Sequence, residues 1–337
     1  MLYIRTDMNN KIATGHVMRC LAIADAAREL NEDTTFILAD RQAEDFIKEK
    51  GFHTIILGTE WDNMDQEIGF LLEVVNKENI KGILIDSYMV TRHYLETLSE
   101  HIKTAYIDDL GTFFYPVHML VCYAIYWESL GYIEHYKKTK LLLGTKYAPL
   151  RKVFQNCTKK EVKEKIENVL LLSGGTDRYQ ILEGILEEIE RGRYKRIDVV
   201  CGRYYKDYKV LCRKYQAEKN IYIHKAVDNI EEYMKQADMA ISAGGMTLYE
   251  LCACGTPAIS YSFADNQLEN VLQFQKEGLM EYAGDIRTTN IYKKIASILE
   301  KYNQDFALRK ECSNKMQDLL DGNGAKRIAE EFILFFQ

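Results

Sequence analysis

The sequence predicts an α/β protein made of two Rossmann-like domains, each built on a parallel sheet. Short apolar runs alternate with amphipathic stretches of helix length along all 337 residues, which is typical of βαβ units in a sheet covered on both faces. The same alternation occurs in each half of the chain. With 47% apolar residues, a chain of this length can bury a separate core in each of two domains.

Each half contains six predicted strands, all of them apolar runs bounded by polar or turn-forming residues. In the first half they are Leu2–Asp7, Thr34–Asp40, His53–Gly58, Gly82–Ser87, Thr104–Asp109 and His118–Tyr123. In the second half they are Asn168–Ser173, Arg196–Gly202, Asn220–His224, Met239–Ala243, Pro257–Phe263 and Met280–Gly284.

The segment LLLGTKYAPLRKVFQNCTKKE connects the two halves and passes from apolar to charged. We therefore place the domain boundary between Phe154 and Glu161, with an N-terminal domain of residues 1–155 and a C-terminal domain of residues 156–337. The final segment, GAKRIAEEFILFFQ, predicts an amphipathic helix that could pack back on the N-terminal domain.

The charge pattern excludes several classes of partner. The net charge is −6 and no long basic run occurs, which argues against nucleic acid and against an anionic membrane surface. No apolar run approaches the length of a membrane span, and no signal peptide is visible. We expect a cytoplasmic protein that holds any anionic ligand through local groups. The oligomeric state is left open.

The cysteines do not form a metal or disulfide motif. There is no CxxC pair and no His/Cys cluster, so reduced and mostly buried thiols without a metal are expected. Cys252 and Cys254 lie two apart on a predicted helix and hence on different faces. The eight cysteines are Cys20, Cys122, Cys157, Cys201, Cys212, Cys252, Cys254 and Cys312.

The stretch from Met239 to Gln267 carries the strongest functional signal. A strand ends near Ser242, Gly244 and Gly245 would allow positive φ and close approach of a ligand, and Thr247 and Glu250 fit an S/T-x-x-E capping box. The free N–H groups and the dipole of such a helix start attract phosphate.

Two interpretations of this turn stay open. The glycines could merely turn the chain, and Glu250 could be a structural cap as well as a ribose acceptor. Asp265-Asn266-Gln267, which follows the next strand, favours a ligand, because open parallel sheets bind ligands at the carboxyl ends of their strands. A second turn, Ser173-Gly174-Gly175-Thr176-Asp177, repeats the pattern. Two glycine turns in one domain favour a diphosphate-bearing ligand.

In the first half, Asp7 ends a strand, and a polar loop leads to a long helix that starts near Gly15 and His16. The positive end of the helix dipole disfavours imidazolium, so we expect a neutral His16 that can accept a proton near pH 7. Arg19 shares its helix face by the i, i+3 spacing, and we expect Asp7 and Arg19 to bind the substrate. A lone histidine is more often structural, but its place beside a glycine at a parallel-sheet turn favours function.

Two more polar groups end strands of the first half. Asp108 and Asp109 could orient a histidine or a sugar hydroxyl, or could cap the next segment. Asp86-Ser87-Tyr88 places polar groups at the same edge, and Tyr88 could stack on a sugar ring or pack in the core.

These motifs resemble one family along nearly the whole chain. ATGHVMRCLAIA, AYIDD, LLLGTKYAPLR, LLSGGTD, ISAGGMTLYELCACGTPAI with the following NQ, and DGNGAKRIA are similar to the hydrolases that remove UDP from 2,4-diacetamido-2,4,6-trideoxyaltrose in pseudaminic acid biosynthesis. That family has the GT-B fold, two Rossmann-like domains facing across a cleft. The chain also resembles spore-coat polysaccharide proteins and, more distantly, MurG-type glycosyltransferases, with which it shares the C-terminal motif.

The resemblance implies a role for each matching residue. His16 would activate water for inverting attack at the anomeric carbon, and Gly15 would let the loop approach the sugar. The phosphates would lie at Gly245, Met246 and Thr247, and the ribose at Glu250. The remaining nucleotide and sugar contacts would come from Gly174, Gly175, Thr176, Asn266 and Gln267. No cofactor is implied.

The chain departs from the family pattern in two places. Ser87 stands where many members have histidine, and Cys122 and Ala124 stand where they have asparagines. Both places face the sugar in the family. The leading hypothesis is therefore a metal-independent UDP-sugar hydrolase, with a glycosyltransferase that uses a UDP-sugar and a non-catalytic nucleotide-sugar-binding protein as alternatives.

Overall fold

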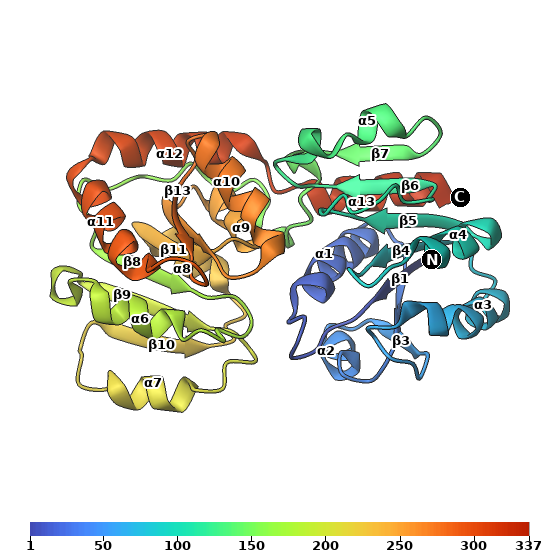
Figure 1. Ribbon diagram of the computed structural model, residues 1–337, viewed down its shortest axis with the longest axis horizontal. Coiled ribbons are helices and arrows are strands. Elements are labelled where there is room, and N and C mark those ends of the chain that lie inside the picture. The colour runs from blue at the N-terminus through green and yellow to red at the C-terminus, as the bar shows by residue number, and fades with distance from the viewer. Residues whose placement is uncertain (337) are drawn as a thin grey trace. The chain divides into compact units, whose positions relative to one another are not determined.

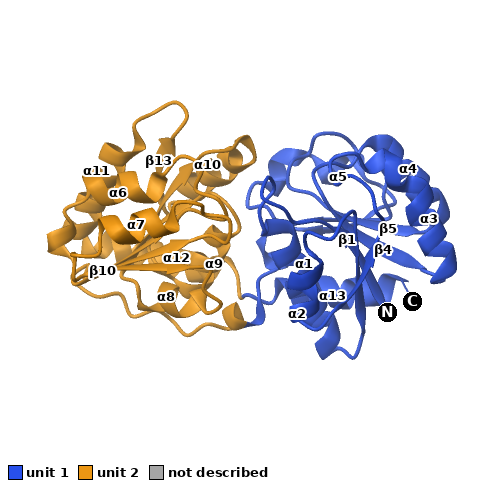
Figure 2. Ribbon diagram, turned by 90° about the horizontal axis from the view of Figure 1, so that it is seen from below, with its two compact units in different colours: residues 1–152, 322–337 blue, residues 153–321 orange. Residues whose placement is uncertain are grey.

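The computed structural model describes residues 1–336. They form two compact units, one of residues 1–152 together with the C-terminal segment from Gly322, and one of residues 153–321 (Figure 2). The boundary thus lies between Lys152 and Val153, close to the expected division at residue 155.

The first unit contains a seven-stranded parallel sheet in the order β3-β2-β1-β4-β5-β6-β7 (Figure 1). Its strands are β1 (Leu2–Thr6), β2 (Thr34–Leu38), β3 (His53–Ile56), β4 (Gly82–Asp86), β5 (Lys103–Ile107), β6 (Met119–Cys122) and β7 (Lys140–Leu143). Its helices are α1 (Gly15–Glu29), α2 (Glu44–Glu49), α3 (Ile68–Lys77), α4 (Arg92–His101), α5 (Tyr132–His135) and α13 (Gly324–Phe336).

The second unit contains a six-stranded parallel sheet in the order β10-β9-β8-β11-β12-β13. Its strands are β8 (Asn168–Leu172), β9 (Arg196–Cys201), β10 (Ile221–Lys225), β11 (Met239–Ala243), β12 (Ala258–Ser262) and β13 (Glu281–Asp285). Its helices are α6 (Ile181–Glu188), α7 (Tyr208–Lys214), α8 (Ile230–Gln236), α9 (Thr247–Cys254), α10 (Leu268–Lys276), α11 (Ile291–Gln304) and α12 (Phe306–Leu319).

All twelve predicted strands are present, within a few residues of their expected ends. The sequence interpretation missed β7, whose apolar run was assigned to the connection between the domains. β7 is the edge strand and pairs only with β6, so three of its four residues are half-buried and it lacks the buried pattern of the central strands.

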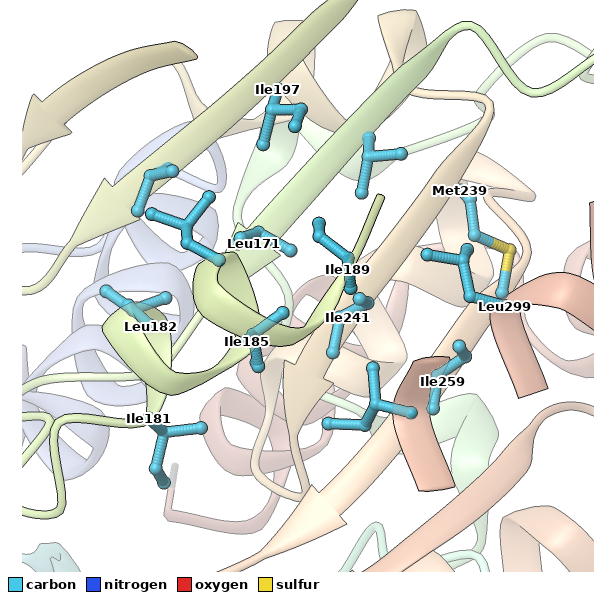
Figure 3. Close-up of a cluster of buried hydrophobic side chains, with 14 of the residues drawn as sticks. Leu171, Ile181, Leu182, Ile185, Ile189, Ile197, Met239, Ile241, Ile259 and Leu299 are labelled. Carbon is cyan, nitrogen blue, oxygen red and sulfur yellow. The ribbon is translucent and has the colours of Figure 1, made fainter. Parts of the chain in front are cut away.

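The core of the second unit shows why these segments become helices and strands. On α6, Ile181, Leu182 and Ile185 recur at helical spacing and are completely buried. Figure 3 shows them in one cluster with Leu171 and Ile241 of the central strands. Because helices cover both faces of such a sheet, the side chains of its central strands β8 and β11 are buried on both faces.

The last helix belongs to the first unit. α13 packs against α1, and Phe336 covers Gly82 so closely that a Cβ there would lie 2.0 Å from Phe336 Cδ1. At its other end, Gly324 meets the Ala148 backbone, 2.1 Å from the position of a Cβ. Two close approaches that only glycine permits thus fix α13 on this unit.

Among residues 1–336, no helix combines the length and apolar character needed to cross a membrane.

Candidate active site

The strand order of the first unit brings four loops together at one sheet edge. β1, β4, β5 and β6 are neighbours in the sheet, and all run in the same direction, so their carboxyl ends meet. His16 and Arg19 follow β1 on α1, Asp86 ends β4, Asp109 follows β5 and Tyr123 follows β6. Side chains more than 100 residues apart in sequence thus form one polar cluster, as between Arg19 and Tyr123.

A histidine–aspartate pair lies at the centre of this cluster. His16 is the second residue of α1, and its Nδ1 lies 2.7 Å from Oδ1 of Asp86. Asp86 is fully buried. Burial acts to raise the pKa of Asp86, but the Arg19 guanidinium and His16 outweigh burial and hold that pKa well below its ordinary value. An ionised carboxylate only accepts, so Nδ1 carries a proton and Nε2 is the nitrogen left to contact a ligand.

The guanidinium of Arg19 forms its hydrogen bonds with side chains of the first unit. Its Nε donates to Asp86 Oδ2 at 2.6 Å, its Nη2 to Asp86 Oδ1 at 2.5 Å and its Nη1 to the Tyr123 hydroxyl at 2.6 Å. Nη2 also lies 3.0 Å from Nδ1 of His16, a contact of two donors. Arg19, predicted to bind substrate, instead holds the carboxylate that orients His16.

Asp109 and Tyr88 also belong to the polar cluster around His16. Oδ2 of Asp109 accepts from the hydroxyls of Tyr88 and Tyr123, both at 3.1 Å, and the Tyr88 ring meets the His16 ring edge to face at 4.6 Å. Oδ1 of Asp109 is buried and has no hydrogen-bond partner in the described part of the chain. An unpaired carboxylate oxygen is costly, so it is available for a donor from a ligand.

Asp108 caps the loop that follows β5, which is one of the two roles that the sequence left open for it. Its carboxylate accepts from the backbone N–H groups of Leu110 and Gly111, at 3.1 and 2.9 Å, and from the hydroxyls of Tyr115 and Tyr132. The side chain is fully buried. These contacts make it a structural acceptor, and the partner of His16 is Asp86 instead.

Asp7, predicted to bind substrate, belongs to a buried ion network. Its Oδ2 accepts from Arg5 Nη1 at 2.5 Å and its Oδ1 from the Ala39 N–H at 2.9 Å. Arg5 also forms a fork with Glu67, at 2.7 Å from Nε to Oε1 and 2.6 Å from Nη2 to Oε2, and Tyr94 donates to Oε1 at 2.7 Å. Both oxygens of Asp7 are thus occupied within the scaffold.

The positions that depart from the family pattern are buried. Cys122 and Ala124 belong to the apolar core of the first unit, and between them Tyr123 turns its hydroxyl toward Asp109. Ser87 is 8% exposed, and its Oγ accepts from the Met89 N–H. All three side chains are therefore buried, and those of Cys122 and Ala124 point into the core because alternate residues at a strand end share one face.

The turn between β11 and α9 differs from the expected capping box. The helix begins at Thr247 with Met246 at the N-cap position, since the Leu248 N–H already bonds to the Gly245 carbonyl. Neither Gly244 nor Gly245 has a positive φ. A Cβ at residue 244 would lie 2.4 Å from Val271 Cγ1, whereas one at 245 would meet nothing within 4 Å. Gly244 is thus required by packing, and Gly245 borders open space.

A buried side chain that the sequence interpretation missed supports this turn. Asn270 donates to the Gly244 carbonyl at 3.1 Å and accepts from the Tyr249 hydroxyl at 2.8 Å. The predicted ligand residue Gln267 also supports the loop, because its Oε1 accepts from the Phe263 N–H at 3.0 Å. Its neighbour Asn266 is exposed.

The turn after β8 is shaped by a second close approach. Gly174 has φ +75°, and a Cβ there would meet nothing within 4 Å. The turn passes over Gly202 at the end of β9, where a Cβ would lie 2.2 Å from the Gly174 carbonyl oxygen and 2.4 Å from that of Gly175. The Tyr204 N–H donates to the Gly175 carbonyl at 3.1 Å. Thr176 follows directly and is half-buried.

Asp177 ties this turn to α6. Its carboxylate accepts from the N–H groups of Ile181 and Leu182, at 2.8 and 3.2 Å. Burial raises the pKa of Asp177 to about 6, although these two hydrogen bonds act to lower it. The unfolded chain therefore ionises first as the pH rises, and the contribution of Asp177 to stability falls between its ordinary value of 3.8 and about 6.

The Asp177→Asn variant is expected to remove this pH dependence. Asparagine tolerates the positive φ of 46° at this position and keeps one acceptor oxygen. Relative to wild type, the free energy of unfolding of the variant should rise by up to about 3 kcal/mol from pH 4 to pH 7. Urea denaturation of both proteins at the two pH values measures this difference. An unchanged difference would show that Asp177 ionises alike in both states.

The comparisons with known proteins concern both halves of the chain. A family model described as the glycosyltransferase family 28 C-terminal domain matches residues 150–330. The uncharacterised protein MJ1062 of Methanocaldococcus jannaschii is 29% identical over 272 residues, which cover 76% of this chain and 54% of the relative. The spore coat polysaccharide biosynthesis protein SpsG of Bacillus subtilis is 22% identical over 93% of this chain and 92% of its own.

A third relative is similar to about half of this chain. The UDP-N-acetylglucosamine--N-acetylmuramyl-(pentapeptide) pyrophosphoryl-undecaprenol N-acetylglucosamine transferase of Campylobacter jejuni is 29% identical over 55% of this chain and 53% of its own. The chain thus spans about half the length of this relative and of the Methanocaldococcus protein.

The structural comparison concerns the fold. The crystal structure of MurG from Acinetobacter baumannii has a TM-score of 0.71 at 10% identity, covering 99% of this chain and all of that one. With the two parallel-sheet α/β units, this likeness confirms the predicted GT-B fold class.

Proposed function

Because the chain belongs to the family of the glycosyltransferase family 28 C-terminal domain, we propose that it is an enzyme that cleaves the bond between UDP and a sugar. The observation that carries this proposal is the pair formed by His16 and Asp86 at the carboxyl edge of the first sheet. An imidazole that a buried, ionised carboxylate holds in one orientation is the arrangement of a general base.

The chemistry follows from the tautomer. Nε2 of His16 accepts a proton from a water molecule as its oxygen attacks the anomeric carbon, and the bond from that carbon to the diphosphate oxygen breaks. UDP leaves with the electron pair, and attack opposite the leaving group inverts the configuration. Asp86 stabilises the imidazolium that forms and stays ionised.

The second unit would bind the UDP half of the substrate. Gly174 and Gly245 border open space, and α9 begins at Thr247, two residues after Gly245, so the positive end of its dipole lies at this turn. Backbone donors and the helix dipole can stabilise the charge of the departing diphosphate without a metal ion. Glu250, in the first turn of α9, would accept from the ribose hydroxyls.

Transfer of the sugar to an acceptor is the second candidate. It is favoured by the family match and by the likeness to a transferase that uses UDP-N-acetylglucosamine. His16 could deprotonate an acceptor hydroxyl as readily as water, because the base needs the same geometry for both. The leading proposal remains hydrolysis, which the GHVMRC motif around His16 supports by its resemblance to UDP-sugar hydrolases.

A panel of UDP-sugars offered without an acceptor separates the two reactions. For a hydrolase, at least one donor, with an amino-deoxy sugar preferred, should release UDP at a rate proportional to protein concentration. Release that occurs only after an acceptor is added would establish the transferase. If UDP does not bind in calorimetry, the assignment of both glycine turns to a nucleotide fails.

The Gly202→Ala variant tests the proposed nucleotide site indirectly, because Gly202 supports the turn at Gly174 and Gly175. The added methyl group overlaps the Gly174 and Gly175 carbonyl oxygens, so the turn must move. Displacement of a binding loop at a cost of about 1–3 kcal/mol should weaken UDP binding by roughly ten- to a hundredfold in calorimetry. Gly192→Ala is the matched control, since a Cβ there meets nothing within 4 Å. Equal affinity for both variants would contradict the placement of UDP at this turn.

A further inference from the structure

We propose that Asp109 recognises the sugar of the substrate, and that it selects a sugar with a hydroxyl or N–H donor over a sugar with a carboxylate. This selection rests on the proposed cleavage of a UDP-sugar and names the class of sugar that the polar cluster around His16 would accept. Asp109 follows β5 at the carboxyl edge of the first sheet.

The two carboxylate oxygens of Asp109 have different surroundings. Oδ2 accepts from the hydroxyls of Tyr88 and Tyr123, both at 3.1 Å, whereas Oδ1 is buried and accepts from no residue of the described chain. A carboxylate oxygen that lacks a donor is costly, and a donor from a ligand removes this cost. The side chain is 13% exposed, and the soft χ2 torsion of aspartate lets the carboxylate turn toward a donor that approaches from the exposed side.

The preceding aspartate shows that the turn does not impose an unpaired oxygen. The carboxylate of Asp108 accepts from two backbone N–H groups and two tyrosine hydroxyls. The backbone of Asp109 is also held, because the Tyr126 hydroxyl donates to its carbonyl at 2.6 Å. Asp109 is therefore a fixed residue with one acceptor left for a ligand.

Asp109 lies close to the proposed base. One guanidinium contacts both groups, since Arg19 Nη2 lies 3.0 Å from Nδ1 of His16 and Nη1 lies 3.5 Å from Oδ2 of Asp109. Tyr88 joins them a second time, with its ring 4.6 Å from the His16 ring and its hydroxyl on Asp109. A sugar whose anomeric carbon lies at His16 thus brings a substituent of its ring to Asp109.

The charge of the cluster determines the class of sugar. Asp86 and Asp109 contribute two negative charges and Arg19 one positive charge, which leaves a net charge of −1 on these three side chains. The hydrogen bonds of Arg19 already go to Asp86 and Tyr123. A sugar carboxylate would therefore meet a like charge, whereas a hydroxyl or an amide N–H is a suitable donor for Asp109.

Three UDP-sugars separate these classes. UDP-glucose offers hydroxyls, UDP-N-acetylglucosamine adds an amide N–H, and UDP-glucuronic acid carries a carboxylate. For the wild type, kcat/KM for UDP release should be at least about tenfold higher for one of the two neutral donors than for UDP-glucuronic acid. The better of the two neutral donors shows whether a hydroxyl or the amide is recognised. An equal or higher value for UDP-glucuronic acid would overturn the proposal.

The Asp109→Asn variant removes the charge at nearly constant size. For the neutral donors, kcat/KM should fall by about tenfold, because a hydrogen bond to a charged group becomes one to a neutral amide. UDP-glucuronic acid should lose nothing, so the selectivity narrows. If Asp109 only anchors Tyr88 and Tyr123, the values for all three donors fall by the same factor, and this outcome contradicts the proposal. A thermal melt checks that the variant is folded, and the wild-type selectivity decides the matter if it is not.

Asp40→Asn is the matched control. Asp40 follows β2 of the same sheet and is also half-buried, but both of its oxygens accept from Gln42. This variant should keep the wild-type selectivity. If the wild type releases UDP from no donor, the proposed function fails, and the Kd values of the three intact donors in calorimetry test Asp109 by the same ratios. Turnover with an unchanged selectivity in Asp109→Asn would show that only the role of Asp109 is wrong.

Discussion

Replacement of His16 by alanine should lower kcat for UDP release by about 10²–10⁴-fold, the usual contribution of a general base, while the Kd for UDP changes little. The imidazole is proposed to act on the nucleophile, and the nucleotide is proposed to bind at the glycine turns of the other unit. Quenched assays of UDP release measure kcat, and calorimetry with UDP measures Kd.

His224→Ala is the matched control for this experiment. His224 also pairs with a carboxylate, with Nε2 at 2.8 Å from Asp198 Oδ1, but it lies on β10, the edge strand of the second sheet. Its loss should leave kcat unchanged. If His16→Ala retains the wild-type rate, His16 is not the base. Asp86→Asn gives a further test, because it should lower kcat at constant KM if Asp86 acts by orienting His16.

The Glu67→Gln variant should have the largest effect on stability, a loss of about 3–5 kcal/mol in the free energy of unfolding. Arg5 and Glu67 are both fully buried and form two parallel hydrogen bonds. Glutamine keeps only one acceptor oxygen, so its amide nitrogen would face an N–H donor of Arg5, and one buried charge-assisted hydrogen bond would become a contact of two donors. Because a domain is typically stable by about 5–15 kcal/mol, urea denaturation should show a clear shift of the midpoint.

A surface ion pair provides the comparison. Lys315 and Glu311 are 2.8 Å apart, but their side chains are 46% and 61% exposed, so solvent screens the attraction. Glu311→Gln should therefore leave the midpoint almost where it is in wild type. A similar shift for both variants would show that the buried network around Arg5 contributes no more than an exposed pair.

The sequence interpretation succeeded where the signal is local. Twelve strands were predicted from short apolar runs and their turns, and His16 was placed at the start of a helix, where α1 indeed begins one residue earlier. β7 was missed because an edge strand has only one partner and a mixed burial pattern. The capping box at Thr247 was wrong because the first helical hydrogen bond starts at Gly245, which the spacing of two residue types does not reveal.

By itself, the sequence determined the α/β class, the two-domain organisation and the turns where chemistry is concentrated, because helix and strand periodicity and glycine turns are properties of neighbouring residues. Tertiary structure alone decided which side chains meet. The partner of His16 is Asp86, since β4 lies beside β1 in the sheet, while Asp108 points to tyrosines and caps a loop. Strand order sets such contacts across about 70 residues of sequence, and no local pattern specifies it.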